Sequence, residues 1–128
     1  MPKRVLNTPS APGALGPYSV AVEAGGLVFI SGQVAIDPGT GDRAPDDVGA
    51  QARQIMRNLE AILGDIGLSW EDVAKTTIFL ADINDFPVVN DIYGDYFDNE
   101  PPARSTVQVG ALPGGFLVEI EVMAARKY

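Results

Sequence analysis

The chain has 128 residues, of which 46% are hydrophobic and 20% are charged, and its formal net charge at pH 7 is −8. This length predicts a single domain over residues 1–128, and no apolar run approaches the roughly 20 residues that a membrane-spanning helix requires. The acidic charge, with no long Lys/Arg cluster to offset it, argues against nucleic acid as a partner. Lys3 and Arg4 precede no apolar secretory segment, so we expect a cytoplasmic protein.

Histidine and cysteine are both absent from the sequence. Their absence excludes disulfides, thiol nucleophiles, histidine-based catalytic triads and zinc fingers. The aspartates fall in expected turns or helix ends, and none has the spacing of a calcium-binding loop, so no metal site is predicted. Any catalysis must therefore use carboxylates, arginine, hydroxyls, backbone groups and water.

The first third of the chain predicts a loop and a hairpin after a short strand at residues 3–6. Residues 8–17 are too rich in Pro and Gly for a helix or a strand, and we expect them to form an ordered loop. Two strands at residues 20–23 and 27–33 then flank Gly25-Gly26, a favoured two-residue hairpin turn.

Tyr18 and Gly32 are the first two candidate functional residues. Tyr18 follows the loop and is either a packed ring with a satisfied hydroxyl or a contact to a substrate. Gly32 lies near the end of the second hairpin strand, where the missing Cβ allows a ligand or another backbone to come close. A β-bulge or a simple strand end explains Gly32 at least as well.

Two amphipathic helices are expected in the middle of the chain. Apolar residues recur at three- and four-residue steps over residues 46–66, with aspartates suited to cap the first turn and Gly67 suited to end the helix. Asn84 and Asp85 are expected to cap a second helix, which ends near residues 98–100.

Arg104 stands at the start of an apolar strand in the last third of the chain, after a strand expected at residues 73–80. A hairpin-like connection rich in Pro and Gly leads from there to a last strand over residues 116–123. Glu119 and Glu121 alternate with aliphatic residues in this last strand and therefore share one of its faces.

The chemistry of Arg104 and Glu119 leaves alternatives open. A guanidinium in an apolar strand requires an anion, which is either an internal Asp or Glu or the carboxylate of a ligand. Glu119 is either that internal partner or a general acid/base that orients a water molecule for attack on an electrophilic carbon. Asn90, in the expected second helix, is on its own more typical of a surface or local hydrogen-bonding residue.

The order of the elements, three strands, a helix, a strand, a helix and two strands, predicts an α+β fold. Both helices are expected to cover one face of a mixed, six-stranded sheet. The strands are too apolar for the whole opposite face to remain in water. We therefore expect the chain to self-associate through that face.

Short motifs spread over nearly the entire chain occur in this order: Gly16-Pro17-Tyr18-Ser19, Ser31-Gly32-Gln33, Gln51-Ala52-Arg53, Asn84-Asp85-Phe86, Pro102-Ala103-Arg104-Ser105 and Val118-Glu119-Ile120-Glu121. This combination resembles the RidA/YjgF family of reactive-intermediate deaminases. The resemblance implies a chorismate-mutase-like α+β fold, assembled as a homotrimer with clefts between neighbouring subunits. It also implies hydrolysis of 2-imino acids such as 2-iminobutanoate and 2-iminopropanoate, or their enamine tautomers, to 2-keto acids and ammonia without a cofactor or metal.

Carried over position by position, the resemblance assigns roles to the candidate residues. Arg104 would bind the substrate carboxylate, and Glu119 would hold the attacking water near the imine carbon. Tyr18 and Gly32 would line the pocket, and Asn90 would lie close to it.

Ser105 and Thr106 would add polar contacts from their backbone groups. The family often has cysteine at the position of Thr106, so the chain departs from the pattern there, which leaves its substrate preference open. A thiol cannot be essential if threonine serves. Because an iminium carbon is already electrophilic, positioning, one oriented water and complementary charge suffice for the reaction.

A second function, from a different class, is a noncatalytic or regulatory trimer that binds small carboxylates or keto acids in the same clefts. Such a binder needs Arg104 but tolerates Glu119→Gln, whereas a hydrolase loses rate with that change. Endoribonuclease activity, which has been attached to some relatives, is disfavoured by the acidic charge and the missing basic groove.

Overall fold

The computed structural model describes residues 2–126, which contain six strands, two α-helices and three short 3-10 turns. The strands are β1 (Arg4–Val5), β2 (Ala21–Ala24), β3 (Leu27–Gln33), β4 (Val73–Leu80), β5 (Ala103–Gln108) and β6 (Val118–Ala125). The helices are α1 (Val48–Asp65) and α2 (Phe86–Gly94), and the 3-10 turns are η1 (Trp70–Asp72), η2 (Ile83–Asp85) and η3 (Pro113–Gly115). Neither α-helix within these residues combines the length and the apolar character that crossing a membrane demands.

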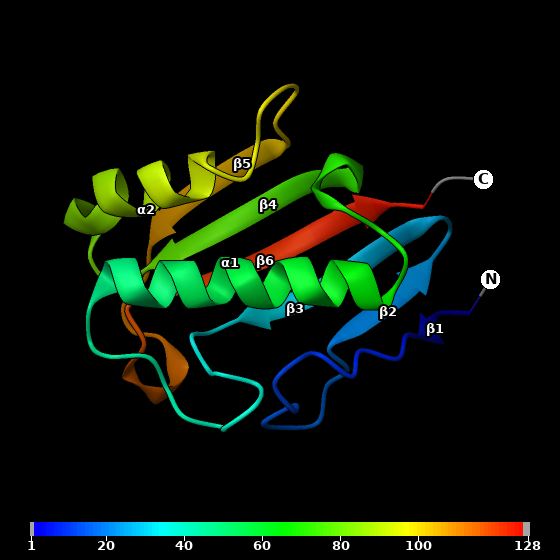
Figure 1. Ribbon diagram of the computed structural model, residues 1–128, viewed down its shortest axis with the longest axis horizontal. Helices are drawn as coiled ribbons and strands as arrows, with labels where there is room; N and C mark the ends of the chain where they lie inside the picture. The colour runs from blue at the N-terminus through cyan, green and yellow to red at the C-terminus, as the bar shows by residue number, and fades with distance from the viewer. Residues whose placement is uncertain (1, 127–128) are drawn as a thin grey trace.

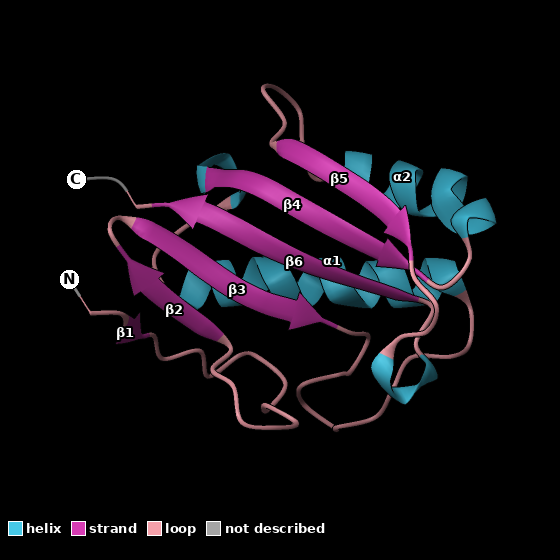
Figure 2. Cartoon of the chain, turned by 180° about the vertical axis from the view of Figure 1, so that it is seen from behind, coloured by secondary structure: helices cyan, strands magenta, loops and turns pink. Residues whose placement is uncertain are grey.

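The six strands form one mixed sheet in the order β1-β2-β3-β6-β4-β5 (Figure 2). Neighbouring strands are antiparallel except β4 and β5, which run parallel and are connected through α2. The hairpin of β2 and β3 turns at Gly25 and Gly26, whose φ angles of +58° and +80° favour glycine. The predicted mixed sheet and this hairpin are therefore confirmed.

The hairpin-like connection predicted between the last two strands was wrong. β5 and β6 are not neighbours, because β4 lies between them and pairs with both. The crossover through α2 places β5 beside β4 at the edge of the sheet, and the chain then passes through η3 to insert β6 between β3 and β4. A parallel pair needs such a long crossover, and the local sequence pattern does not reveal which strand is inserted later.

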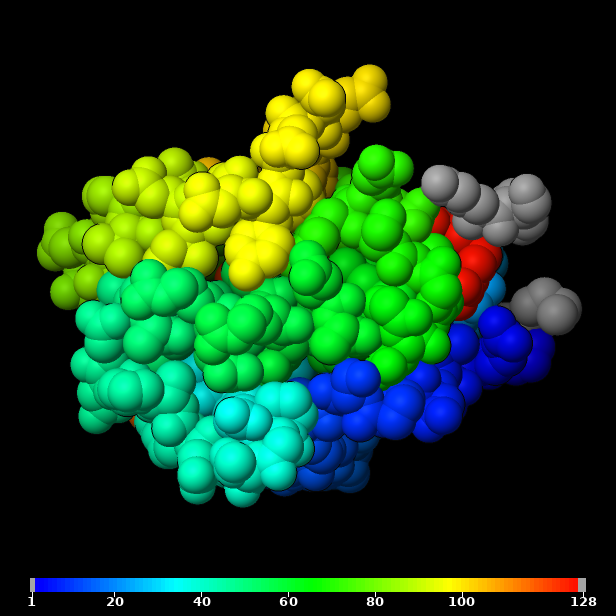
Figure 3. All heavy atoms as spheres, viewed as in Figure 1, coloured from blue at the N-terminus to red at the C-terminus, as the bar shows by residue number. Residues whose placement is uncertain are grey.

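Both helices lie against the same face of the sheet, as predicted (Figure 1). The core between α1 and the central strands includes Ile55, Leu59, Ile62, Ile78 and Ile120, all at most 1% exposed. Figure 3 shows the helices and their loops closing over this face, while the segment between α2 and β5 projects from the edge of the molecule.

The opposite face of the sheet is covered by no helix of residues 2–126 (Figure 2). It presents Leu27, Phe29, Val107 and Met123, whose exposed fractions lie between 37% and 44%, on the same side as Glu119. The apolar face that the sequence led us to expect is therefore present, and we refer to it below as the bare face.

The ends of α1 follow the predicted capping pattern. The Asp47 carboxylate accepts a hydrogen bond from the Ala50 amide at 2.8 Å, which satisfies one of the free donors in the first turn. Gly67 adopts a φ of +77° directly after the C-cap residue, the left-handed conformation that ends many helices.

The second helix is shorter than predicted, because α2 ends at Gly94 instead of near residues 98–100. Beyond Gly94 the chain turns so that Tyr96 and Phe97 pack on Trp70, with ring centroids 5.5 and 5.2 Å apart. Tyr96 and Phe97 therefore gain their packing outside the helix.

The start of α2 also differs from the predicted capping. The side chain that forms a cap is that of Asp82, which precedes η2. Its carboxylate accepts a hydrogen bond from the Asn84 amide at 2.9 Å. Asp85 occupies the N-cap position of α2 but makes no capping hydrogen bond with its side chain.

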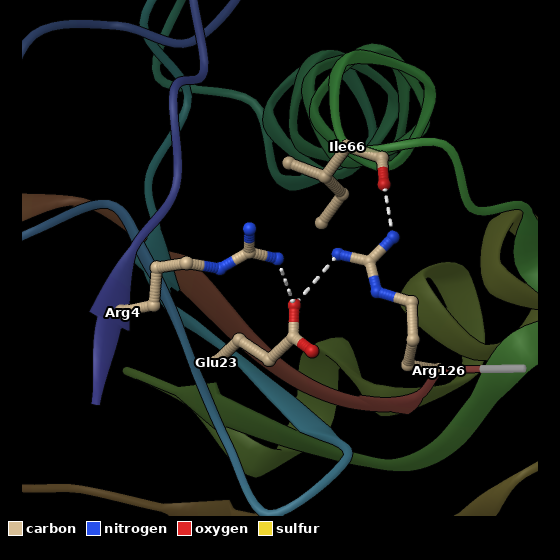
Figure 4. Close-up of polar contacts among 4 residues, drawn as sticks. All are labelled: Arg4, Glu23, Ile66 and Arg126. Atoms are coloured by element: carbon tan, nitrogen blue, oxygen red, sulfur yellow. Dashed lines mark hydrogen bonds and ion pairs between the residues drawn. The ribbon is translucent and has the colours of Figure 1, made fainter. Parts of the chain in front are cut away.

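One carboxylate links the first strand, the β2–β3 hairpin and the end of the last strand (Figure 4). Glu23 Oε1 accepts from Arg4 Nη2 at 2.9 Å and from Arg126 Nη2 at 3.0 Å, and Arg126 Nη1 donates to the Ile66 carbonyl at the end of α1. The hydrogen bonds from Arg4 and Arg126 lower the pKa of Glu23 below its ordinary value.

Candidate active site

Arg104 lies on β5 and points toward α2. Its Nη1 donates to Asn90 Oδ1 at 2.8 Å, and its guanidinium carbon lies 5.0 Å from the ring centre of Tyr93 and 5.4 Å from that of Phe86. Arg104 forms no ion pair with any carboxylate of residues 2–126. The internal ion pair considered from the sequence is therefore absent from this part of the chain, and most guanidinium donors remain free for an anion.

A cavity of about 620 Å³ opens beside Arg104. Arg104 and Thr106 line it from β5, and the segment entering α2 supplies the rest: Ile83, Asn84, Phe86 and Pro87. Since β5 is the outermost strand, the cavity lies at a free edge of the sheet. The Thr106 Oγ1 is buried and has no hydrogen-bond partner within the described residues. Ser105 is exposed, and its side chain points to the bare face.

Glu119 lies at the beginning of β6 and reaches over Gly32. A Cβ on Gly32 would fall 2.8 Å from Glu119 Cδ and would collide with Oε2. The β-bulge interpretation of Gly32 is confirmed, because the β3–β6 register shifts between Ile30 and Gln33. The group that comes close to the glycine is a carboxylate of the same chain.

The carboxyl group of Glu119 has no hydrogen-bond partner within residues 2–126. Its partial burial raises its pKa above the ordinary value, and the nearby charge of Glu121 adds to the effect. A carboxylate with a raised pKa is a stronger proton acceptor, which suits a general base.

Tyr18 contributes to a second cavity, of about 400 Å³, that contains Glu119. Its remaining lining residues are Leu15, Gly32, Val34, Pro113, Gly114 and Phe116. The ring of Tyr18 is 46% exposed, and its hydroxyl oxygen accepts from the Leu15 amide at 3.2 Å. The hydroxyl proton therefore remains available for donation to a ligand.

Apart from Ser105, which lines neither cavity, the predicted site residues form two groups, around what we call the Arg104 cavity and the Glu119 cavity. The two cavities share no lining residue. Arg104 pairs with Thr76 on β4, whereas Glu119 pairs with Phe79, three residues further along the same strand. An odd offset places the two side chains on opposite faces, and the spacing of strands and residues puts their α-carbons roughly 14 Å apart.

Sequence reasoning missed the aromatic residues that surround Arg104. Phe86 and Tyr93 are apolar residues of α2, and this pattern predicts packing but no contact with arginine. Their spacing of seven residues, two helical turns, is the one signal that both rings meet the same neighbour.

Comparison with known proteins agrees with this fold and these motifs. The family model described as Endoribonuclease L-PSP matches residues 8–126. The 2-iminobutanoate/2-iminopropanoate deaminase of Mus musculus is 47% identical over 124 residues, which cover 97% of this chain and 92% of that protein.

Two solved structures illustrate the likeness in three dimensions. YyfA from Yersinia pestis, a Rid family protein of unknown function, superposes with a TM-score of 0.93 at 49% identity, covering 97% of this chain and 99% of that one. E. coli TdcF with bound serine gives a TM-score of 0.90 at 43% identity, with the same coverage of both chains. The chain therefore belongs to the RidA/YjgF family.

Proposed function

We propose that this protein hydrolyses 2-imino acids, or their enamine tautomers, to 2-keto acids and ammonia. The observation that carries the proposal is the partly buried Arg104, whose guanidinium has only the neutral Asn90 as a hydrogen-bond partner in residues 2–126. A 2-imino acid supplies the missing carboxylate, and Glu119 supplies a basic group with a raised pKa. The name of the mouse relative supports the same reaction.

We further propose that the protein acts as a homotrimer in which each site forms between two subunits. Arg104 and Glu119 of one chain are roughly 14 Å apart on opposite faces, which is too far for one small substrate. The Arg104 cavity lies at a sheet edge, where the Glu119 cavity of a neighbouring copy has room to meet it. Association through the bare face would also remove its exposed Phe29 and Met123 from water.

The proposed chemistry conserves the carboxylate of the substrate and changes only its second carbon. Arg104 holds the carboxylate through two N–H groups, and Glu119 accepts a proton from a water whose oxygen attacks the imine carbon. The resulting carbinolamine carries one oxygen and one nitrogen on that carbon. Glu119 returns its proton to the nitrogen, the C–N bond breaks and ammonia leaves, and the hydroxyl proton passes to the Glu119 carboxylate as the oxygen forms the keto group. Tyr18, with a free hydroxyl proton, is placed to bond an oxygen of the substrate.

A noncatalytic carboxylate binder remains the second candidate. The solved TdcF structure carries bound serine, a small carboxylate, and this favours ligand capture as a function in its own right. In that case Arg104 would still be needed and Glu119 would not.

The deciding experiment measures keto-acid release from freshly generated 2-iminobutanoate and 2-iminopropanoate. Wild type, Arg104→Ala and Glu119→Gln are compared at equal concentration with the spontaneous rate, and Arg53→Ala serves as a control for loss of one positive charge. We expect acceleration by wild type and the control, a loss of about 10²-fold in Arg104→Ala, and a smaller loss in Glu119→Gln. Wild type that does not exceed the spontaneous rate would refute the deaminase.

The trimer is tested by light scattering, which gives molar mass independently of shape. We expect about three times the 13.5 kDa of one chain. A monomer would refute the shared site, and an active monomer would also refute the argument from the distance between Arg104 and Glu119.

A further inference from the structure

Arg43 is fixed by its backbone close to the end of β3. It forms an isolated antiparallel bridge with Ile36, and the next residue, Ala44, donates its amide to the Ala35 carbonyl at 2.9 Å. The side chain of Arg43 therefore starts from an anchored position, although the turn before it is exposed.

The guanidinium of Arg43 touches two residues that line the Glu119 cavity. Its Nη1 donates to the Gly114 carbonyl, and its central carbon lies 4.0 Å from the centre of the Phe116 ring. Arg43 itself lines a neighbouring depression and not the Glu119 cavity. It therefore contacts the wall formed by Gly114 and Phe116 from outside the cavity.

Phe116 packs into the core and is 4% exposed, whereas the turn before it, residues 113–115, is exposed. Gly114 and Gly115 are consecutive glycines with φ of +77° and +73°, so the chain loses much backbone freedom when this turn folds. Inside η3 the Gly115 amide bonds to the Leu112 carbonyl at 3.0 Å. Just beyond the turn, Gln51 accepts from the Leu117 amide at 2.9 Å.

We propose that Arg43 is a positioning residue for the Glu119 cavity. The hydrogen bond to Gly114 and the stacking on Phe116 hold η3 in one conformation, and thereby fix the apolar wall that faces Glu119. This inference rests on the proposed function, because the wall then sets where the imine carbon lies relative to the water held by Glu119. A small displacement of a substrate from its reactive position lowers the rate severely.

Three variants test this role. Arg43→Met keeps an unbranched stem but removes the guanidinium, and Arg43→Lys keeps the charge but loses the planar group that stacks and donates. Arg57→Met is the matched control, because it removes the same charge from α1, where Arg57 donates to Gln54 at 3.0 Å. kcat and KM are measured for 2-iminobutanoate, and amide hydrogen exchange is followed over residues 112–117.

We expect Arg43→Met to lower kcat/KM about tenfold and to speed amide exchange in residues 112–117, with Arg43→Lys between it and wild type. The control should stay within twofold of wild type in both measurements. Unchanged exchange in Arg43→Met would overturn the inference, and so would faster exchange with kcat/KM still within twofold.

Failure of the proposed function gives a different result. If wild type does not hydrolyse the imines, binding of 2-oxobutanoate replaces the rate as the readout, and Arg43→Met should weaken it at least fivefold while exchange accelerates. Equal binding by wild type and Arg43→Met, or no binding by wild type, would overturn the role of Arg43.

Discussion

Arg104 and Arg126 are both partly buried arginines, but only Arg126 has a carboxylate partner in residues 2–126. Arg126 donates to the carboxylate of Glu23 and to the Ile66 carbonyl, so its charge is matched inside the molecule. Arg104 donates to a neutral amide oxygen and lies near two aromatic rings. The difference indicates that Arg126 serves the fold, whereas Arg104 is held ready for an anion from outside.

The largest expected effect is that alanine at Arg104 lowers activity and spares stability, whereas alanine at Arg126 lowers stability and spares activity. Arg104→Ala should lower kcat/KM for 2-iminobutanoate by about 10²-fold and destabilise the fold by no more than about 1 kcal/mol. Arg126→Ala should keep kcat/KM within about threefold and lose about 1–2 kcal/mol, because the end of α1 loses a donor. Steady-state kinetics measure kcat/KM, and urea unfolding measures the stability of both variants. An Arg104→Ala variant that unfolds would contradict the view that Arg104 serves the site and Arg126 the fold.

A second test concerns Glu119 and the space above Gly32. Gly32→Ala should displace the carboxylate, because the new Cβ would collide with Oε2, and we expect a loss in kcat/KM of about tenfold. Stability should change little, since the end of a flexible side chain can move. Gly64→Ala is the control, because a Cβ at Gly64 meets nothing within 4 Å. Equal rates in the two variants would contradict the role of the close approach.

The pH dependence of the two carboxylates should have opposite signs. Glu119 has a raised pKa in the folded state, so its contribution to stability is present below its ordinary pKa of 4.5 and is lost as pH rises through the folded value. Glu23 has a lowered pKa, so its contribution is present above 4.5 and is lost as pH falls through the folded value. Glu119→Gln should therefore stabilise the protein at pH 7, by less than about 1 kcal/mol because the group is half-exposed.

Urea unfolding at pH 4 and pH 7 measures both effects, with Glu23→Gln expected to destabilise the protein at pH 7 and much less at pH 4. The pH dependence of the rate should reflect the ionisation of Glu119. In wild type, kcat/KM relative to the spontaneous reaction should fall on the acid side with an apparent pKa above 4.5, and Glu119→Gln should lack this limb. An acid limb that persists in Glu119→Gln would assign it to another group.

The smallest expected effect belongs to Thr106, whose Oγ1 is buried without a hydrogen-bond partner in residues 2–126. Thr106→Val should therefore be neutral or stabilise the fold by up to about 1 kcal/mol. kcat/KM should change less than about threefold, because the oxygen itself is buried. Thermal unfolding and kinetics check both, and a large loss of rate would mean that the hydroxyl turns to bond the substrate.

Much of the fold could be predicted because short-range patterns determine it. The three- and four-residue spacing in α1 and the glycine pair between β2 and β3 each determine a local structure. The end of α2 could not be predicted, because Tyr96 and Phe97 continue a helical pattern but pack on Trp70, whose position depends on the tertiary fold.

The site was harder to predict than the fold. Motifs pointed to Arg104 and Glu119, but the distance between them depends on β4 lying between β5 and β6. The sequences of β5 and β6 do not reveal this strand order. The contact of Arg43 with Phe116 gave no signal at all, since the two residues are far apart in sequence and follow no shared motif.

The carboxylate of Glu23 also bears on how the chain could be rearranged. Arg4 in β1 and Arg126 just after β6 bond to the same oxygen atom, so the first and last strands are within a short distance of each other (Figure 4). A glycine-serine linker long enough to pass β2 and β3 should therefore connect Arg126 to Pro2, and the chain could be opened in the exposed turn around Gly41. Such a circular permutant would keep every pair of neighbouring strands, and its new ends would lie between β3 and α1 instead of beside β1 and β6.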